Sequence, residues 1–592
     1  MKTEKKLSAL RQEMAARQIA AVVVPSADPH QSEYVTAHWQ ARAWLTGFTG
    51  SAGVAVVTRT RAILWTDSRY WLQAVAQLKG SEFELFRSGE KGVPECHRWI
   101  FDHLCSGDEV AIDGRVISRN QEKTYRRLWE VRGIRLRMDL DLVGSLWQDR
   151  PPMPITKAWE FDVRFAGRSR ADKIEKIREA MDRAGADCHM MIGLEDIAWT
   201  FNLRGSDIPN IPVNIAFALV THDQVRLFIH PDKVDGKLAE ALAADGINLS
   251  EYTDIDTALA RLPDSARVLL DPDMTAAGLS SAINPACRII EKSSPAARLK
   301  AVKNKVQIGH LRDTAVKDGI AVVGFLYWLS NRDPGNPVTE ISAAQKLYGL
   351  RAAQPDFVEN SFDPIMAYGP HSAMCHYSAT LQTDARLENA GMFLTDSGGN
   401  YLTGTTDITR TLCLGEPTLQ QIRDYTLVLK GHIAVATACF PEGTRGFQID
   451  TLARQYLWQN GMNFGHGTGH GVGFFLCVHE GPARISPHPV DAALEKGMLM
   501  TNEPGLYREG EYGIRLENMV LVTDARQTEF GRFLGFENLT WCHFERGLID
   551  TGLLTDLERS WIDRYHQQVC DRLSSHLEAP VAAWLYRQTR PL

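Results

Sequence analysis

Hydrophobic positions in the first part of the chain follow a helical spacing and then a strand-like run. Apolar residues from Leu7 to Ile19 recur at helical intervals, which indicates an amphipathic helix. The apolar runs at residues 20–25 (AAVVVP) and 61–66 (RAILWT) indicate buried strands. This order of elements predicts an α/β domain at the start of the chain.

A proline-rich break separates this region from a second one with the same pattern. Residues 149–154 (DRPPMP) fit neither a helix nor a central strand, because proline lacks the amide hydrogen that both use. Helical spacing then resumes at residues 169–184. The stretches 43–51 (AWLTGFTGS) and 198–206 (AWTFNLRGS) are alike, and each follows a helix and an apolar strand, so we expect a duplicated α/β unit.

A second break, near residues 292–295 (KSSP), precedes a long amphipathic pattern from 298 to 329 that predicts one or two helices. A chain of 592 residues is also too long for a single core. We therefore expect three domains, at residues 1–152, 153–296 and 297–592. The third contains the dense clusters of acidic residues and histidines.

Composition and charge exclude several classes of function. The net charge is −7 and no segment combines basic and aromatic residues into a groove, so nucleic acid is not expected as a partner. No apolar run approaches the length of a membrane span, and the early run at 19–25 is too short and too late for a secretory signal. The ten cysteines are scattered singly, which is typical of reduced thiols in the cytoplasm.

Four carboxylates in the third region lie at the ends or edges of expected strands. Asp396 ends an apolar strand, and Asp407 lies on the threonine-rich strand that returns from the turn. If this turn centres on residues 401–402, the two aspartates face each other with Cβ atoms roughly 5 Å apart. Glu503 precedes a Pro-Gly turn, and Glu517 lies on the next strand.

A glycine-rich stretch at residues 465–473 (GHGTGHGVG) fits either a phosphate-binding loop or a backbone that carries histidines to a metal. It lacks the Lys-Ser/Thr pair of a phosphate-binding loop, and no dinucleotide fingerprint surrounds it. So many glycines favour an extended chain, on which His466 and His470 stand roughly 13 Å apart. They cannot both ligate one ion, so one is a ligand and the other has a different role. His376 and His479 add to the cluster.

The charges of these residues predict a dinuclear metal centre. Two divalent cations balance the four carboxylates Asp396, Asp407, Glu503 and Glu517, with His470 as the nitrogen ligand. Oxygen-rich ligation favours Mn²⁺, and the set also admits Co²⁺ or Zn²⁺. Two such ions can hold a hydroxide at neutral pH and polarise a carbonyl, which indicates metal-assisted hydrolysis of an amide.

The motifs around these residues resemble the pita-bread metallopeptidases. The ligand motifs are TDSGG, GTTDITRT, HGTGHGVG, TNEPG and GIRLENMV. Further similarity to the three-domain cytosolic aminopeptidases P, also called Xaa-Pro aminopeptidases, covers nearly the whole chain in PSADPHQSEYV, GFTGSAG, LWTDSRYWLQA, NLRGSD, LKAVKN and WLYRQTRPL. This resemblance implies a mixed α/β (α+β) fold with two creatinase-like N-terminal α/β domains and a C-terminal pita-bread catalytic domain.

The resemblance also implies an activity and a set of metal ligands. It implies a homodimeric, commonly manganese-dependent enzyme that releases the first residue from peptides whose second residue is proline. Asp407 and Glu517 would bridge two metals, Asp396 would bind one, and His470 with Glu503 the other. Glu503 would also accept the proton of the attacking water.

Four further residues receive roles from the same resemblance. His479 would donate a hydrogen bond to the oxyanion, and His376 and His466 would hold the proline side of the scissile bond. Arg515 would orient a ligand carboxylate.

Three positions depart from the family pattern. Leu506 replaces an aromatic residue, residues 474–477 (FFLC) replace a more usual SFLN, and the stretch around Asn210 lacks a tyrosine.

Three other interpretations compete with this resemblance. They are a prolidase specific for dipeptides, a pita-bread binding protein without catalysis, and a metal-free creatinase-type hydrolase. The duplicated N-terminal half argues against prolidase, and the complete ligand set argues against the other two.

Overall fold

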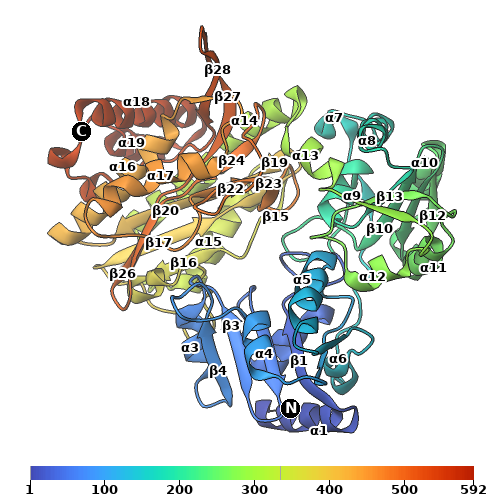
Figure 1. Cartoon of the computed structure of the whole chain (residues 1–592). Helices are drawn as coiled ribbons and strands as arrows, with labels where there is room; N and C mark the ends of the chain where they lie inside the picture. Colours follow the sequence, from blue (N-terminus) through green and yellow to red (C-terminus); the bar gives the residue numbers. More distant parts are fainter. Residues whose placement is uncertain (1, 334) are drawn as a thin grey trace. The chain divides into compact units, whose positions relative to one another are not determined.

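The computed structural model describes residues 2–333 and 335–592, and the chain forms two compact units (Figure 1). The first comprises Met1–Val163 and Arg168–Ala297, and the second comprises Arg164–Gly167 and Arg298–Leu592. Among the helices described, none combines the length and the apolar character needed to cross a bilayer.

The first unit contains two six-stranded sheets of identical topology. Their strand orders are β4-β3-β2-β1-β5-β6 and β12-β11-β10-β8-β13-β14. In the first sheet β1 pairs antiparallel with β2 and parallel with β5. In the second sheet β8 pairs in the same two ways with β10 and β13. The predicted duplication is therefore confirmed. The strands are β1 (Ile19–Pro25), β2 (Val54–Thr58), β3 (Ala62–Thr66), β4 (Phe83–Arg87), β5 (Glu109–Ala111), β6 (Arg135–Arg137), β8 (Cys188–Met191), β10 (Ala216–Thr221), β11 (Val225–Ile229), β12 (Ile247–Ser250), β13 (Arg267–Leu270) and β14 (Arg288–Glu291).

Helices occur at matching places in the two halves of this unit. A long helix precedes the first strand of each sheet, and a short helix that opens the AWLTGFTGS or AWTFNLRGS stretch follows that strand. Both long helices bury an apolar stripe, which is what their predicted spacing requires. They are α1 (Thr3–Ala16) and α8 (Arg170–Ala184), and the short ones are α2 (Ala41–Thr46) and α9 (Leu194–Thr200).

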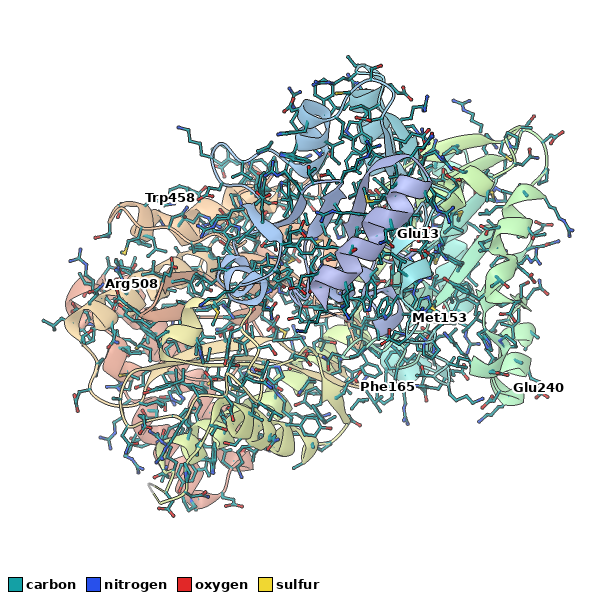
Figure 2. All side chains as sticks on the ribbon, turned by 90° about the horizontal axis from the view of Figure 1, so that it is seen from below. Glu13, Met153, Phe165, Glu240, Trp458 and Arg508 are labelled. Atoms are coloured by element: carbon teal, nitrogen blue, oxygen red, sulfur yellow. The ribbon has the colours of Figure 1, made fainter. Side chains whose placement is uncertain are left out.

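The amphipathic pattern at 298–329 forms two helices, α13 (Pro295–Ala301) and α14 (Lys305–Ser330). Asn304 separates them, because its side chain accepts hydrogen bonds from the first amides of α14. The other main helices of the second unit are α15 (Glu340–Ala352), α16 (Leu419–Ala436), α17 (Gly446–Trp458), α18 (Asp556–Leu573) and α19 (Ala579–Gln588). Figure 2 shows the side chains and labels Trp458, at the end of α17, which is about half exposed.

The second unit also contains antiparallel sheets. They have the orders β15-β18-β19, β16-β17-β20, β21-β28-β27-β24-β22-β23 and β25-β26. The strands are β15 (Phe357–Asn360), β16 (Ile365–Tyr368), β17 (Met392–Ser397), β18 (Gly399–Tyr401), β19 (Gly404–Thr405), β20 (Ile408–Cys413), β21 (Phe440–Pro441), β22 (Gly469–Gly471), β23 (Glu480–Ile485), β24 (Leu499–Asn502), β25 (Gly505–Arg508), β26 (Tyr512–Arg515), β27 (Asn518–Thr528) and β28 (Gly531–Asn538).

The turn between the two aspartate-bearing strands differs from the prediction by one residue. Tyr401 pairs with Gly404, so the turn consists of residues 402–403 and not 401–402. This shift places Thr409, not Asp407, directly opposite Asp396. The two aspartates still share a face of the hairpin, because positions two apart on a strand point to the same side.

Candidate metal centre

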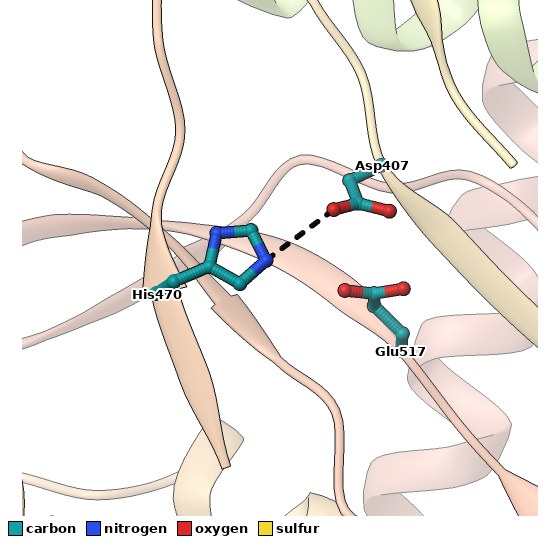
Figure 3. A group of neighbouring side chains, drawn as sticks. All are labelled: Asp407, His470 and Glu517. Carbon is teal, nitrogen blue, oxygen red and sulfur yellow. Dashed lines mark ion pairs between the residues drawn. The ribbon is translucent and has the colours of Figure 1, made fainter. Parts of the chain in front are cut away.

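Three side chains from separate segments of the chain converge in the second unit. Asp407, His470 and Glu517 each offer a ligand atom, and these atoms all lie within 4.8 Å of one another (Figure 3). Asp407 precedes β20, His470 lies in β22, and Glu517 lies between β26 and β27. Asp407 and Glu517 are buried, whereas His470 is partly exposed.

The two other predicted ligands border this group. Glu503 follows β24, and its Oε1 lies 3.5 Å from His470 Nε2, the same distance that separates this nitrogen from Asp407 Oδ2. Asp396 is buried on β17, and Arg515 donates a hydrogen bond to its Oδ2. Among the residues that the structure describes, its Oδ1 meets no hydrogen-bond partner. Glu503 thus lies beside His470, and Asp396 is near enough for its charge to act on Glu503 and Glu517.

The His470 ring is held in the tautomer that suits a metal ligand. Its Nδ1 lies 2.8 Å from the carbonyl oxygen of Gly471, which can only accept a hydrogen bond. Nδ1 therefore keeps its proton, and Nε2, which faces Asp407 and Glu503, is the nitrogen that would ligate a metal ion.

Glu517 is oriented by the hairpin that carries Asp407. Thr409 Oγ1 donates to Glu517 Oε2 at 2.8 Å, and the Glu517 amide donates to the Thr409 carbonyl at 3.1 Å. The buried Arg410 guanidinium donates to the carbonyls of Thr409 and Glu517 at 2.9 and 2.7 Å. Three of these hydrogen bonds join the segment around Glu517 to β20.

The electrostatics of the group fit a cationic cofactor. Burial and the neighbouring Asp407 raise the pKa of Glu517 well above its usual range. Burial also raises the pKa values of Asp396 and Glu503. Burial alone would lower the pKa of His470, but Asp407 and Glu503 outweigh it and raise the value to about 9.

Such a cluster of acids is costly to keep ionised without cations. Oxygen donors, one imidazole nitrogen and the partnerless buried Oδ1 of Asp396 form a donor set that suits divalent metal ions. The residues present therefore fit the predicted metal centre.

The glycines of residues 465–473 let the backbone pass close to its neighbours. A Cβ atom on Gly469 would lie 2.0 Å from the carbonyl oxygen of Thr501, and one on Gly471 would lie 2.3 Å from that of Glu480. No side chain fits there, so β22 can pack between its two neighbouring strands only with glycine on either side of His470.

His466, four residues earlier, faces different partners. Its Nε2 lies 2.8 Å from the Tyr507 hydroxyl. Its backbone carbonyl accepts a hydrogen bond from Arg454, which also pairs with the buried Asp450. His466 and His470 therefore have separate environments, as the spacing argument expects.

Tyr507 is a site residue that sequence reasoning missed. Its hydroxyl also accepts a hydrogen bond from Arg515 Nη1 at 2.7 Å. Because Arg515 in turn binds Asp396, a continuous chain of hydrogen bonds joins His466 to a predicted ligand. The stretch EPGLY places Tyr507 on β25, four residues after Glu503, but the sequence does not indicate the partner of its hydroxyl.

The remaining predicted histidines are partly exposed. The His479 ring packs edge-on against the ring of His470, with centroids 4.4 Å apart. His376 follows the 3₁₀ turn Gly369–Ala373, which is tied to β26 because Ser372 Oγ accepts a hydrogen bond from the Gly513 amide. Asp396, Asp407 and Glu517 are buried, whereas Glu503 and the four predicted histidines retain some exposure.

The three departures from the family pattern lie in ordered surroundings. Leu506 is buried in β25, and Phe474 and Cys477 are buried in the loop that precedes His479. Asn210 has a φ of 63°, in the left-handed region that asparagine tolerates.

Comparisons with known proteins agree with this picture along the whole chain. Residues 309–524 match metallopeptidase family M24, and residues 532–592 match the C-terminal region of that family. Residues 6–134 and 149–307 each match a creatinase/prolidase N-terminal domain. The chain is 37% identical to aminopeptidase P1 of Lotus japonicus, over 100% of both sequences. It is also 37% identical to a probable Xaa-Pro aminopeptidase P of Paracoccidioides lutzii, over 100% of this chain and 99% of the relative.

Solved structures support the same assignment. The X-prolyl aminopeptidase of Caenorhabditis elegans, described as a cytosolic enzyme with a di-nuclear active site, has 31% identity and a TM-score of 0.96, with 100% of both chains covered. An Xaa-Pro dipeptidase of Bacillus anthracis has 25% identity and a TM-score of 0.51, and it covers only 64% of this chain. With its duplicated N-terminal half and its M24 domain, the chain belongs to the aminopeptidase P family of metallopeptidases.

Proposed function

We propose that this protein is an Xaa-Pro aminopeptidase that releases the N-terminal residue from peptides with proline in second position. The observation that carries the proposal is the convergence of Asp407, His470 and Glu517 within 4.8 Å, beside Asp396 and Glu503. Full-length similarity to Xaa-Pro aminopeptidases supports the substrate class.

Five residues would hold two divalent metal ions. Asp407 and Glu517 would bridge them, Asp396 would bind one, and His470 and Glu503 the other. When bound, such ions lower the pKa of a water molecule and polarise a carbonyl oxygen. The oxygen-rich donor set supports Mn²⁺ as the metal, and Co²⁺ and Zn²⁺ suit the same donors.

The protein's own side chains would move the proton and hold the substrate. The Glu503 carboxylate accepts the proton of the attacking water and returns it to the proline nitrogen as the C–N bond breaks. His479 donates a hydrogen bond to the carbonyl oxygen as negative charge develops there. His376 and His466 contact the proline side, and Arg515 orients Asp396.

An Xaa-Pro bond needs such a dedicated site. Its nitrogen carries no hydrogen and the proline ring restricts φ, so a site built for ordinary peptides positions this carbonyl wrongly. The partly exposed imidazoles offer both polar contacts and flat faces to the proline ring of the substrate.

Several finer features complete the proposal. The domains are residues 1–152, 153–296 and 297–592, supported by the two matching sheets and by the second compact unit, whose main part begins at Arg298. We expect a cytoplasmic homodimer, and none of the ten cysteines, all of which the structure describes, is in a disulfide. Light scattering at several protein concentrations tests the dimer.

One assay tests the activity. The protein is dialysed against a chelator, supplied with Mn²⁺, and given Arg-Pro-Pro, an Xaa-Pro dipeptide and an Ala-Ala peptide. We expect metal-dependent release of arginine from the tripeptide. Cleavage of the dipeptide alone would identify a prolidase, and the absence of any metal-dependent cleavage would refute the enzymatic role.

A further inference from the structure

Two lysines of the LKAVKN motif lie in the interior of the catalytic unit. Lys300 and Lys303 are 7% and 3% exposed, and Glu480, with 7%, is the acid that pairs with both. Lys303 Nζ donates to Glu480 Oε2, and Lys300 Nζ lies 3.7 Å from Glu480 Oε1. Burying charged groups is costly unless they are paired, so these lysines do not serve to keep the surface soluble and need another role.

Glu480 directly follows His479, and its backbone is held as firmly as its side chain. It pairs with Gly471 across β22 and β23, so closely that a Cβ on Gly471 would overlap the Glu480 carbonyl. Gly471 is the neighbour of His470, against whose ring His479 packs. The position of Glu480 therefore determines where the His479 ring lies relative to the metal centre.

The lysine segment is also attached to the strand that leads to Glu503. Val302 forms an antiparallel bridge with Met498, and the Lys303 amide donates to the Gly497 carbonyl at 2.9 Å. Met498 immediately precedes β24, which ends one residue before Glu503. One short segment, residues 302–303, thus joins the backbone that carries Glu503 to the backbone that carries His479.

We propose that the buried Lys303–Glu480 pair is a positioning element that holds His479 in register with the metal centre. It acts through His479 and touches neither substrate nor metal. The inference rests on the role of His479 in the proposed function. It assigns a task to the LKAVKN motif, which the metal ligands leave unexplained.

Two variants remove the pair in different ways. Lys303→Met keeps most of the length of the side chain without its charge, and Glu480→Gln keeps the shape of the acid without its charge. We expect each to lower kcat on Arg-Pro-Pro about 10- to 100-fold, because displacements near 1 Å in an active site cost that much. KM should change less than about twofold and bound Mn²⁺ should not change, since the metal ligands are untouched.

A matched control removes an ion pair from the same helix region. Arg298, in α13, pairs with Glu495 at 2.8 Å, but its side chain is 72% exposed. Arg298→Met should leave kcat, KM and metal content unchanged, because exposed pairs contribute little. Thermal unfolding of all variants separates loss of folding from loss of positioning.

The combination with His479→Ala provides the decisive comparison. We expect Lys303→Met to change kcat less than about twofold in the His479→Ala background, because the group it positions is already gone. An equal loss in both backgrounds would overturn the inference, as would full kcat in both single variants or failure of both to fold. If His479→Ala alone keeps full kcat, the proposed role of His479 fails instead, and wild-type protein inactive on Arg-Pro-Pro would refute the proposed function itself.

Discussion

His466 and His470 occupy one glycine-rich segment, and their roles differ because their ring nitrogens face different groups. His470 Nε2 faces two carboxylates, whereas His466 Nε2 faces the Tyr507 hydroxyl. The spacing of the two residues predicts that they separate, and the charge balance predicts a single nitrogen ligand. Tyr507, the partner of His466, lies 41 residues away in the sequence, so the spacing of the two histidines cannot indicate this contact.

Substitutions at these residues should separate metal binding from substrate handling. Glu503→Ala should abolish turnover and lower the Mn²⁺ content, because a ligand and a base are lost together. His466→Ala and Tyr507→Phe should keep the metal, and Tyr507→Phe should lower kcat/KM about tenfold, the equivalent of roughly 1.4 kcal/mol. Elemental analysis and steady-state kinetics measure both effects. Equal metal loss in all three variants would contradict the division of roles.

The sequence predicts that strands carry the site residues, but it does not predict how these strands are aligned with one another. The sequence places Glu503 at the end of a strand, and β24 indeed ends at Asn502. The aspartate hairpin is displaced from its predicted register because its tight turn consists of Leu402 and Thr403. Glycine content indicates close backbone approach, but only the fold shows which strand approaches which.

Gly513 offers a test of such an approach at the level of elements. A Cβ at this position would lie 1.8 Å from the Ser372 carbonyl oxygen, so Gly513→Ala must push the 3₁₀ turn away from β26. We expect a loss of roughly 2 kcal/mol or more in unfolding free energy, and weaker activity because His376 follows that turn.

Gly309→Ala is the matched control for Gly513→Ala, because a Cβ there meets nothing within 4 Å inside α14. Alanine in a helix should leave stability unchanged or raise it by up to about 1 kcal/mol. Denaturant unfolding of the two variants provides the comparison. Equal stability of the two would show that the turn yields without cost.

For the molecule as a whole, the duplicated α/β half follows from repeated patterns, and its two sheets have the same strand order. The family prediction is confirmed by relatives that match the full length. Pairs distant in the chain could not be predicted. Lys303 and Glu480 are 177 residues apart, and neither has a periodic pattern that points to the other.

Removal of metal should destabilise the second unit, and more so at higher pH. In metal-free protein, His470 has a pKa raised to about 9, and burial raises that of Glu517. A raised pKa in the folded state favours folding at low pH, and this contribution is lost between the unfolded value of His470, near 6.5, and about 9. Metal ions displace those protons, so the stabilisation by Mn²⁺ should grow from pH 6 to pH 8.

Unfolding temperatures with chelator and with excess Mn²⁺ measure this effect. At a hundredfold excess over Kd the metal adds about 2.7 kcal/mol to the free energy of unfolding. This corresponds to a rise of roughly 5 °C in the unfolding temperature. Hydrogen exchange should locate the protection in β17, β20, β22 and β24, which carry or adjoin the ligands. It should not appear in the sheet β12-β11-β10-β8-β13-β14 of the first unit, where no predicted ligand lies. Equal protection of the two units, or a shift that shrinks from pH 6 to pH 8, would mean that these five residues are not the metal centre.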